Sequence, residues 1–531
     1  MAVRTVSKLL VGFVLVGIGR AEALPIAQFN EADVANQVTV RIAGSSAVDA
    51  MLELQWRVQA AAGGEICVPG SLDIFRSTNL LHRLAFCTAS VSMPVAIRGK
   101  RLAIFKASTD GSGGGVAPLV RPANLVPFFQ VPSGGGTLGG CTGVALAASG
   151  AFAAYTRHDA CDVLTQPMTP DVGVSDLEPN VFQGAFSPTL TVAELNAMTT
   201  QGVAAVVYGV PVSLGLRERL QALSFPSASA CNPGNVAYAA NAETETCMPN
   251  LTTAQLQSLM SGQRSSLCDF ASPTTAGANL CTTTTPSYST ALASSGAVFV
   301  CRRTFNGNFA DGSPLVRSSS TQIAYETRFL GQGCVTASQS FLTAPGDPTH
   351  TTESPDSAGV IACLNSHDAG NRGAIGVLST EFKPAVSDKW RFVRVNGYAP
   401  TLLNAAKSNY DFFGEPTIQW RTTSIAGLPV LSGDQLTAAS SIRMFLSLPA
   451  ILSTINSSLV QSFGDAGFLR NLSTSNVGVS APVPPFNVGA GGAGDLRGNP
   501  TLLVSRGLNG HPNACLPAGG AAGASQIVPP N

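Results

Sequence analysis

Gly- and Ser-rich segments that could bind an anion follow hydrophobic stretches at two points of the chain. Gly44-Ser45-Ser46 follows the stretch 38–43, and Gly111-Ser112-Gly113 follows the stretch 102–106. Each segment leads into a helix-like stretch, and a helix N-terminus presents unpaired backbone N–H groups and the positive end of its dipole. Serine hydroxyls there add further donors, although Ser and Gly at a helix start more often serve only as caps. The two segments together therefore predict contacts to an oxyanion.

A carboxylate is the next candidate. Ser175 and Asp176 follow the short apolar stretch 172–174. An aspartate beside a bound anion is unfavourable unless the anion carries a proton, which hydrogen phosphate does and sulfate does not. Asp176 would accept that proton and would repel sulfate. Capping of a helix before Leu177 is the alternative role, and it is common for aspartate.

A guanidinium would supply the positive charge that the anion requires. Arg302 and Arg303 follow the apolar stretch 296–301, and successive side chains of a strand point to opposite faces, so only one of them can reach the site. Arg303 adjoins the following loop and is the expected ligand, since arginine binds oxyanions through paired donors. Thr304 and Asn306 in that loop are further candidates. Two solvated surface arginines are the alternative.

These residues need a scaffold in which strands alternate with helices. The stretch 47–60 has helical character, and a helix is expected from Val116 onward. This alternation predicts an α/β protein with mixed, mainly parallel sheets. The strand candidates are 38–43, 102–106, 172–174, 204–210, 296–301 and 373–378.

The order of these segments resembles the phosphate-binding protein of the bacterial phosphate ABC transporter, within the type II periplasmic binding proteins. The resemblance follows much of residues 38–400, and its most specific part is 171–179, where Asp176 takes the place of a phosphate-binding aspartate. The segment 304–308 departs from the Ser-Gly-Thr type of sequence expected there, and the segment 117–170 is longer than usual. The other similar segments are 43–47, 110–116, 208–213, 251–262, 301–308 and 373–377.

The resemblance implies a divergent, cysteine-rich member with two lobes and a ligand cleft between them. Lobe I would combine 38–205 with 376–480, and lobe II would span 206–375, joined by hinge strands near Tyr208 and Gly376. The implied ligand is phosphate or a similar oxyanion, and the implied partner is an ABC permease that takes up phosphate. No cofactor is expected.

Export is predicted by residues 1–23, in which a basic start and an apolar run precede Ala21-Glu22-Ala23. The sequence has 12 cysteines without a C-x-x-C spacing, which is typical of disulfides in a periplasmic or secreted protein. Neighbouring cysteines would close short loops, although the sequence leaves the connectivity open. Residues 481–531 read as an irregular Gly/Pro/Ala-rich tail. The neighbouring pairs are 67 with 87, 141 with 161, 231 with 247 and 268 with 281.

Composition and missing motifs exclude several other functions. The 31 basic and 31 acidic residues balance, so nothing indicates nucleic-acid binding. No later stretch is long and apolar enough to span a bilayer, and the five histidines lack metal-ligand spacing. No catalytic motif is present, so an enzyme is not expected. A phosphate-ester hydrolase and a secreted adhesion or assembly protein of the same fold remain the alternatives.

Overall fold

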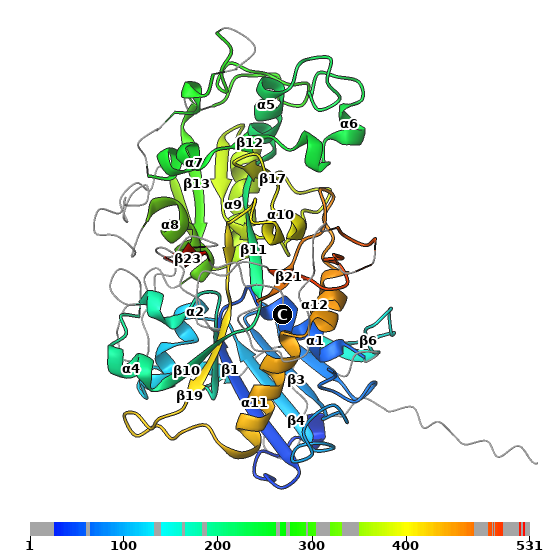
Figure 1. The fold of residues 1–531 in the computed structure, drawn as a ribbon, viewed down its shortest axis with the longest axis vertical. Helices are drawn as coiled ribbons and strands as arrows, with labels where there is room; N and C mark the ends of the chain where they lie inside the picture. The colour runs from blue at the N-terminus through cyan, green and yellow to red at the C-terminus, as the bar shows by residue number, and fades with distance from the viewer. Residues whose placement is uncertain are drawn as a thin grey trace, which may run out of the picture.

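The computed structural model describes residues 26–59, 64–131, 140–161, 165–182, 188–261, 266–271, 277–293, 296–303, 319–331, 350–471, 487–490, 492, 494–502, 520–521 and 524–525. Two large β-sheets with flanking helices form the lower and upper halves of the molecule in Figure 1. The predicted α/β class is confirmed. The predicted leader at 1–23 and most of the predicted tail lie outside the described residues.

The first sheet has nine strands and lies in the lower half of the view (Figure 1). Its central strands β9, β1 and β4 are parallel, as predicted, whereas the β2–β3–β4 meander and the β10 and β19 edge are antiparallel. Every residue of β1 is buried, and β-branched side chains at 38–40 and 42 favour the strand. The strands, in sheet order, are β10 (Met198–Gly202), β19 (Thr417–Arg421), β9 (Val172–Ser175), β1 (Gln37–Gly44), β4 (Arg101–Ala107), β3 (His82–Thr88), β2 (Asp73–Ser77), β7 (Tyr155–Cys161) and β6 (Thr142–Leu146).

Parallel pairing decides where the candidate segments emerge. Because β1, β4 and β9 run in the same direction, their carboxyl ends at Gly44, Ala107 and Ser175 lie at one edge of the sheet. The segments 44–46, 108–113 and 175–176 therefore leave the sheet side by side. This edge faces the upper half of the molecule (Figure 1).

The second sheet has ten strands and a mixed topology. Strands β13, β14 and β15 are parallel, and the long buried strand β11 pairs antiparallel with β15, β17, β16, β18 and β20. The strands are β12 (Asn250–Leu251), β17 (Trp390–Val395), β11 (Ala205–Ser213), β15 (Gly373–Gly376), β13 (Val298–Arg303), β14 (Thr351–Ser354), β16 (Leu378–Ser379), β18 (Phe413–Gly414), β20 (Phe468–Asn471) and β21 (Thr501–Leu502). Two small sheets pair β5 (Val126–Phe129) with β8 (Thr165–Met168) and β22 (Gly520–Ala521) with β23 (Ala524–Ser525).

The boundary predicted at Gly376 differs from the structure. After β15 the chain stays in the second sheet, because β16 and β17 pair with β11, and it returns to the first sheet only between β18 and β19. The outward crossing lies between β10 and β11, close to the predicted hinge at Tyr208. Residues 376–414 thus belong with the second sheet, and β20 also returns there.

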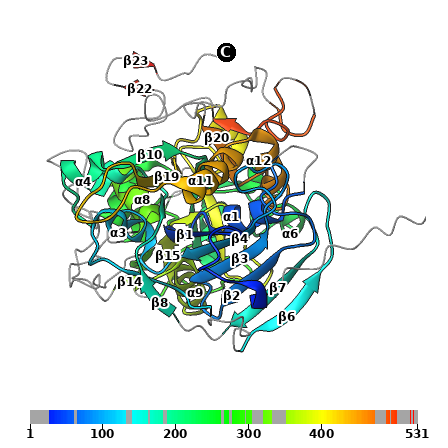
Figure 2. The same cartoon turned by 90° about the horizontal axis from the view of Figure 1, so that it is seen from below.

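Helices cover both sheets. Helix α11 packs on β1 and against α1 over the first sheet (Figure 2), and α9 packs on β13 and β15 of the second. Capping boxes begin α4 and α7. The Gly-rich segment predicted as a loop is itself a helical turn, α2. The helices are α1 (Asp49–Arg57), α2 (Gly111–Gly114), α3 (Ala117–Val120), α4 (Val192–Asn196), α5 (Leu214–Ser224), α6 (Tyr238–Asn241), α7 (Thr253–Met260), α8 (Ser320–Leu330), α9 (Ser357–Ala369), α10 (Leu402–Ala406), α11 (Gly433–Leu446) and α12 (Pro449–Asn456), with 3₁₀ turns at Ile26–Gln28, Pro179–Phe182, Glu245–Cys247 and Leu267–Asp269.

Five disulfides link cysteines within the part of the chain that the structure describes. Four are the neighbouring pairs predicted above, and the fifth, Cys301–Cys363, joins β13 to α9. Cys334 and Cys515 lie outside the described residues. Among the residues that the structure describes, no single helix is long and apolar enough to cross a membrane, and only the bent pair α11 and α12 meets that test together.

Candidate functional site

The three segments of the first sheet contact one another at its carboxyl edge. The backbone N–H of Ser45 donates to the carbonyl of Val174 at 3.0 Å, and the backbone N–H of Asp176 donates to Oγ of Ser112 at 3.3 Å. Gly44 makes this approach feasible: its φ is +120°, and a Cβ there would lie 2.0 Å from the Val174 carbonyl oxygen. The predicted residues 44–46, 112 and 175–176 therefore share one small region.

Asp176 lies at the centre of this region with 1% of its surface exposed. Burial raises the pKa of its carboxyl to about 6, and the hydroxyl of Ser45, the guanidinium of Arg303 and the ammonium of Lys106 each act to lower it. Within the described part of the chain, its Oδ1 is buried and accepts no hydrogen bond. A buried acceptor of this kind is costly unless a ligand donates to it.

Arg303 reaches this region from the second sheet. It ends β13, is 5% exposed, and donates from Nη1 to Oγ of Ser46 at 3.1 Å and from Nη2 to the carbonyl of Pro355 at 3.0 Å. Burial lowers its pKa, and the charge of Asp176 opposes that shift. Its Nε is buried and makes no hydrogen bond to any described residue. The bond to Ser46 connects the two sheets.

The neighbouring arginine has a different role. Arg302 forms an ion pair with Glu353 on the adjacent strand β14. The two arginines thus make separate contacts, as strand geometry predicts, and it is Arg303 that bonds to Ser46, in the segment that follows β1.

Helix α8 contributes residues that were not predicted. Its N-terminus lies against the first sheet, where Oγ of Ser320 is 3.3 Å from Oγ of Ser175. Ser319, the N-cap residue, is 4% exposed, and its Oγ has no partner among the described residues. A helix of 11 residues directs its dipole and its first N–H groups toward this point. The run Ser318-Ser319-Ser320-Thr321 was the available signal in the sequence.

Most of the predicted site residues are brought together. Gly111 and Gly113 lie in α2, whose Ser112 contacts Asp176 and which also packs near α8. Thr304 and Asn306 lie outside the described residues, so their predicted contacts stay predictions. Hydroxyl and guanidinium donors and one carboxylate acceptor therefore converge from both sheets, and this combination suits a small oxyanion that carries a proton.

Among known proteins, similarity to this chain was found only in comparisons with solved structures. No family model and no curated protein matches the chain. A phosphate-binding protein from Stenotrophomonas maltophilia is 12% identical with a TM-score of 0.34, covering 81% of this chain and 99% of that one. PstS from Borrelia burgdorferi is 10% identical with a TM-score of 0.32, covering 81% and 98%. An ABC-type phosphate transport receptor from Vibrio cholerae is 14% identical with a TM-score of 0.30, covering 55% and 79%. Values this low say nothing about the ligand, so its chemistry is inferred from the side chains alone.

Proposed function

We propose that this protein is an exported solute-binding protein that holds phosphate, or a closely similar oxyanion, between its two halves for uptake by an ABC permease. The observation that carries the proposal is the buried pair Asp176 and Arg303, each with an unpartnered polar atom among the described residues. A bound hydrogen phosphate would donate its proton to Asp176 and accept from Arg303. The hydroxyls of Ser45, Ser112 and Ser319 would meet its other oxygens.

A calorimetric titration of the purified, ligand-free protein at pH 8 tests the proposal. We expect one phosphate per chain, arsenate within about tenfold of phosphate because it shares the geometry and the protons, and sulfate at least about a hundredfold weaker. Absence of binding for all three anions would sink the proposal. Turnover of a chromogenic phosphate ester would favour a hydrolase instead.

The contact between the sheets yields a prediction of moderate size. A Ser46→Ala variant should bind phosphate about tenfold more weakly, because Arg303 loses the acceptor that orients it, and hydrogen bonds to charged groups contribute about 1.5–3 kcal/mol. Calorimetry at pH 8 measures the change. Ser71→Ala is the control, since the Ser71 hydroxyl bonds to the Val68 carbonyl just before β2, at the opposite edge of the sheet from Ser46. Equal losses in both variants would show that Ser46 acts only through stability.

A further inference from the structure

A lysine lies buried beneath the candidate site. The side chain of Lys106, near the end of β4, is 0% exposed, and its Nζ donates to the carbonyl of Gly44 at 3.0 Å and to Oγ of Ser108 at 2.6 Å. Gly44 precedes Ser45, whose hydroxyl bonds to Asp176. The ammonium of Lys106 therefore bonds to the residue that precedes Ser45, and the hydroxyl of Ser45 contacts the Asp176 carboxylate.

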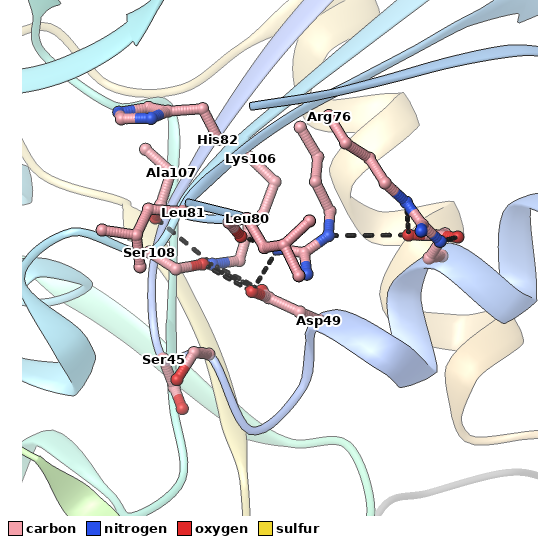
Figure 3. A network of polar contacts seen from close by, with 12 residues as sticks. Ser45, Asp49, Arg76, Leu80, Leu81, His82, Lys106, Ala107 and Ser108 are labelled. Carbon is pink, nitrogen blue, oxygen red and sulfur yellow. Dashed lines mark hydrogen bonds and ion pairs between the residues drawn. The ribbon is translucent and has the colours of Figure 1, made fainter. Parts of the chain in front are cut away.

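Asp49, the first residue of α1, is the counterion of this lysine. Its Oδ1 lies 3.0 Å from Nζ of Lys106, and both of its oxygens accept from Ser108 (Figure 3). Its Oδ2 lies 2.5 Å from Nη1 of Arg83. Arg83 also lies 3.5 Å from Glu53, which pairs with Arg76. The cluster of Lys106, Arg83, Arg76, Asp49 and Glu53 thus holds three cations and two carboxylates.

A charge buried this deeply is unfavourable unless the fold or the function gains from it. Removing an ammonium from water costs several kcal/mol, and a well-packed apolar residue would serve a purely structural role at least as well. Burial lowers the pKa of Lys106, while Asp49 and Asp176 both act to keep the ammonium charged. The lysine therefore interacts with the carboxylate of the site as well as with its own counterion.

We propose that Lys106 is a positioning residue that determines anion specificity: it fixes the Gly44 carbonyl and keeps the Asp176 carboxylate ionised, so that only an anion able to donate a proton is accepted. This inference rests on the proposed function and names a residue through which its selectivity arises. Lys106 acts through Asp176 and does not itself contact the anion.

The charges around both groups set the direction of the expected effect. Cations lower the pKa of Asp176 and carboxylates raise it, so removal of the Lys106 charge raises that pKa further. A protonated Asp176 donates a hydrogen bond and no longer repels sulfate. The groups that face Asp176 are Arg303, Lys106, Asp49 and Glu381, and those that face Lys106 are Asp49, Arg83, Asp176 and His82.

The test follows sulfate affinity from pH 5 to pH 8 by calorimetry on the intact protein. In the wild type, sulfate binding should appear as the pH falls through about 6, where Asp176 takes up its proton. In Lys106→Met this midpoint should move up by about one pH unit. At a fixed pH between the two midpoints, the variant should therefore bind sulfate up to about tenfold more tightly than the wild type. Phosphate affinity should change much less. Difference ¹³C NMR of the carboxyl carbons, assigned with Asp176→Asn, should show the same shift without any anion.

A second variant separates the electrostatic role from a structural one. Asp49→Asn breaks the same ion pair but removes a negative charge, so the midpoint should move down instead of up as long as Lys106 keeps its proton, which the ¹³Cε chemical shift of Lys106 reports. Asp49→Asn also tests the role of Lys106 if Lys106→Met does not fold. Lys100→Met is the matched control, because Lys100 pairs with Asp434 away from the site and should leave the midpoint unchanged.

The outcomes divide cleanly. No shift in Lys106→Met, or an upward shift in Asp49→Asn while Lys106 stays protonated, would overturn the role of Lys106 and leave anion binding intact. Failure of the wild type to bind phosphate would instead refute the proposed function. Opposite shifts of the midpoint in Lys106→Met and Asp49→Asn, with an unchanged midpoint in Lys100→Met, support the inference.

Discussion

An Arg303→Met variant should bind phosphate about a thousandfold more weakly than the wild type. Methionine keeps much of the side-chain volume but removes the charge that offsets both the anion and Asp176, and removing one partner of a buried ionic contact costs about 3–5 kcal/mol. Arg303→Lys should recover only part of the loss, because an ammonium cannot present two parallel donors. Calorimetry at pH 8 measures all three proteins.

Arg302→Met is the matched control for this experiment. Arg302 precedes Arg303 on β13, is also buried, and pairs with Glu353 on the adjacent strand β14. Its replacement should leave phosphate affinity within about threefold, even if the protein melts at a lower temperature. Equal loss in both variants would mean that β13 has been disturbed, and an unchanged Arg303→Met would remove the guanidinium from the site.

The sequence was sufficient to predict the part of the site that lies at strand ends. Gly44, Ser112 and Asp176 each follow a hydrophobic run, and parallel pairing of β1, β4 and β9 brings such positions to one edge. Local order along the chain was enough because the sheet repeats the same geometry at each strand. The alternation of faces along β13 likewise predicted that only one of the two arginines reaches the site, and the position of Arg303 beside the following loop favoured it over Arg302.

Other contributions depend on contacts between distant residues. Lys106 ends the hydrophobic stretch 102–106, and its burial is explained by contacts with Asp49 on α1, Gly44 and Ser108 that the order of residues does not show. Ser319 begins a helix that is separated from Arg303 by a long segment, so proximity in sequence pointed to Thr304 and Asn306 instead. The return of the chain to the first sheet at 415–416 was missed because β16 and β17 have the same hydrophobic character as strands of either sheet.

An Asp176→Asn variant should lose most of its discrimination between phosphate and sulfate. The amide can donate to either anion and carries no charge to repel sulfate, so the phosphate preference at pH 8 should fall from at least about a hundredfold to within about tenfold. Titrations with both anions at pH 8 measure the ratio. An unchanged preference would remove the role that we assign to this carboxylate.

The same substitution should also change how stability depends on pH. The pKa of Asp176 is raised from 3.8 to about 6 in the folded state, so the fold favours the protonated carboxyl, and that stabilisation is fully present below pH 3.8 and is lost as the pH rises through about 6. Above pH 6 the ionised group destabilises the ligand-free protein by about 3 kcal/mol, since one pKa unit corresponds to about 1.4 kcal/mol. Asn carries no proton to lose, so denaturant titrations should show Asp176→Asn gaining about this much over the wild type between pH 4 and pH 8. Phosphate donates a proton to the same carboxylate, so saturating phosphate should remove most of that difference, and this links the buried charge directly to the ligand.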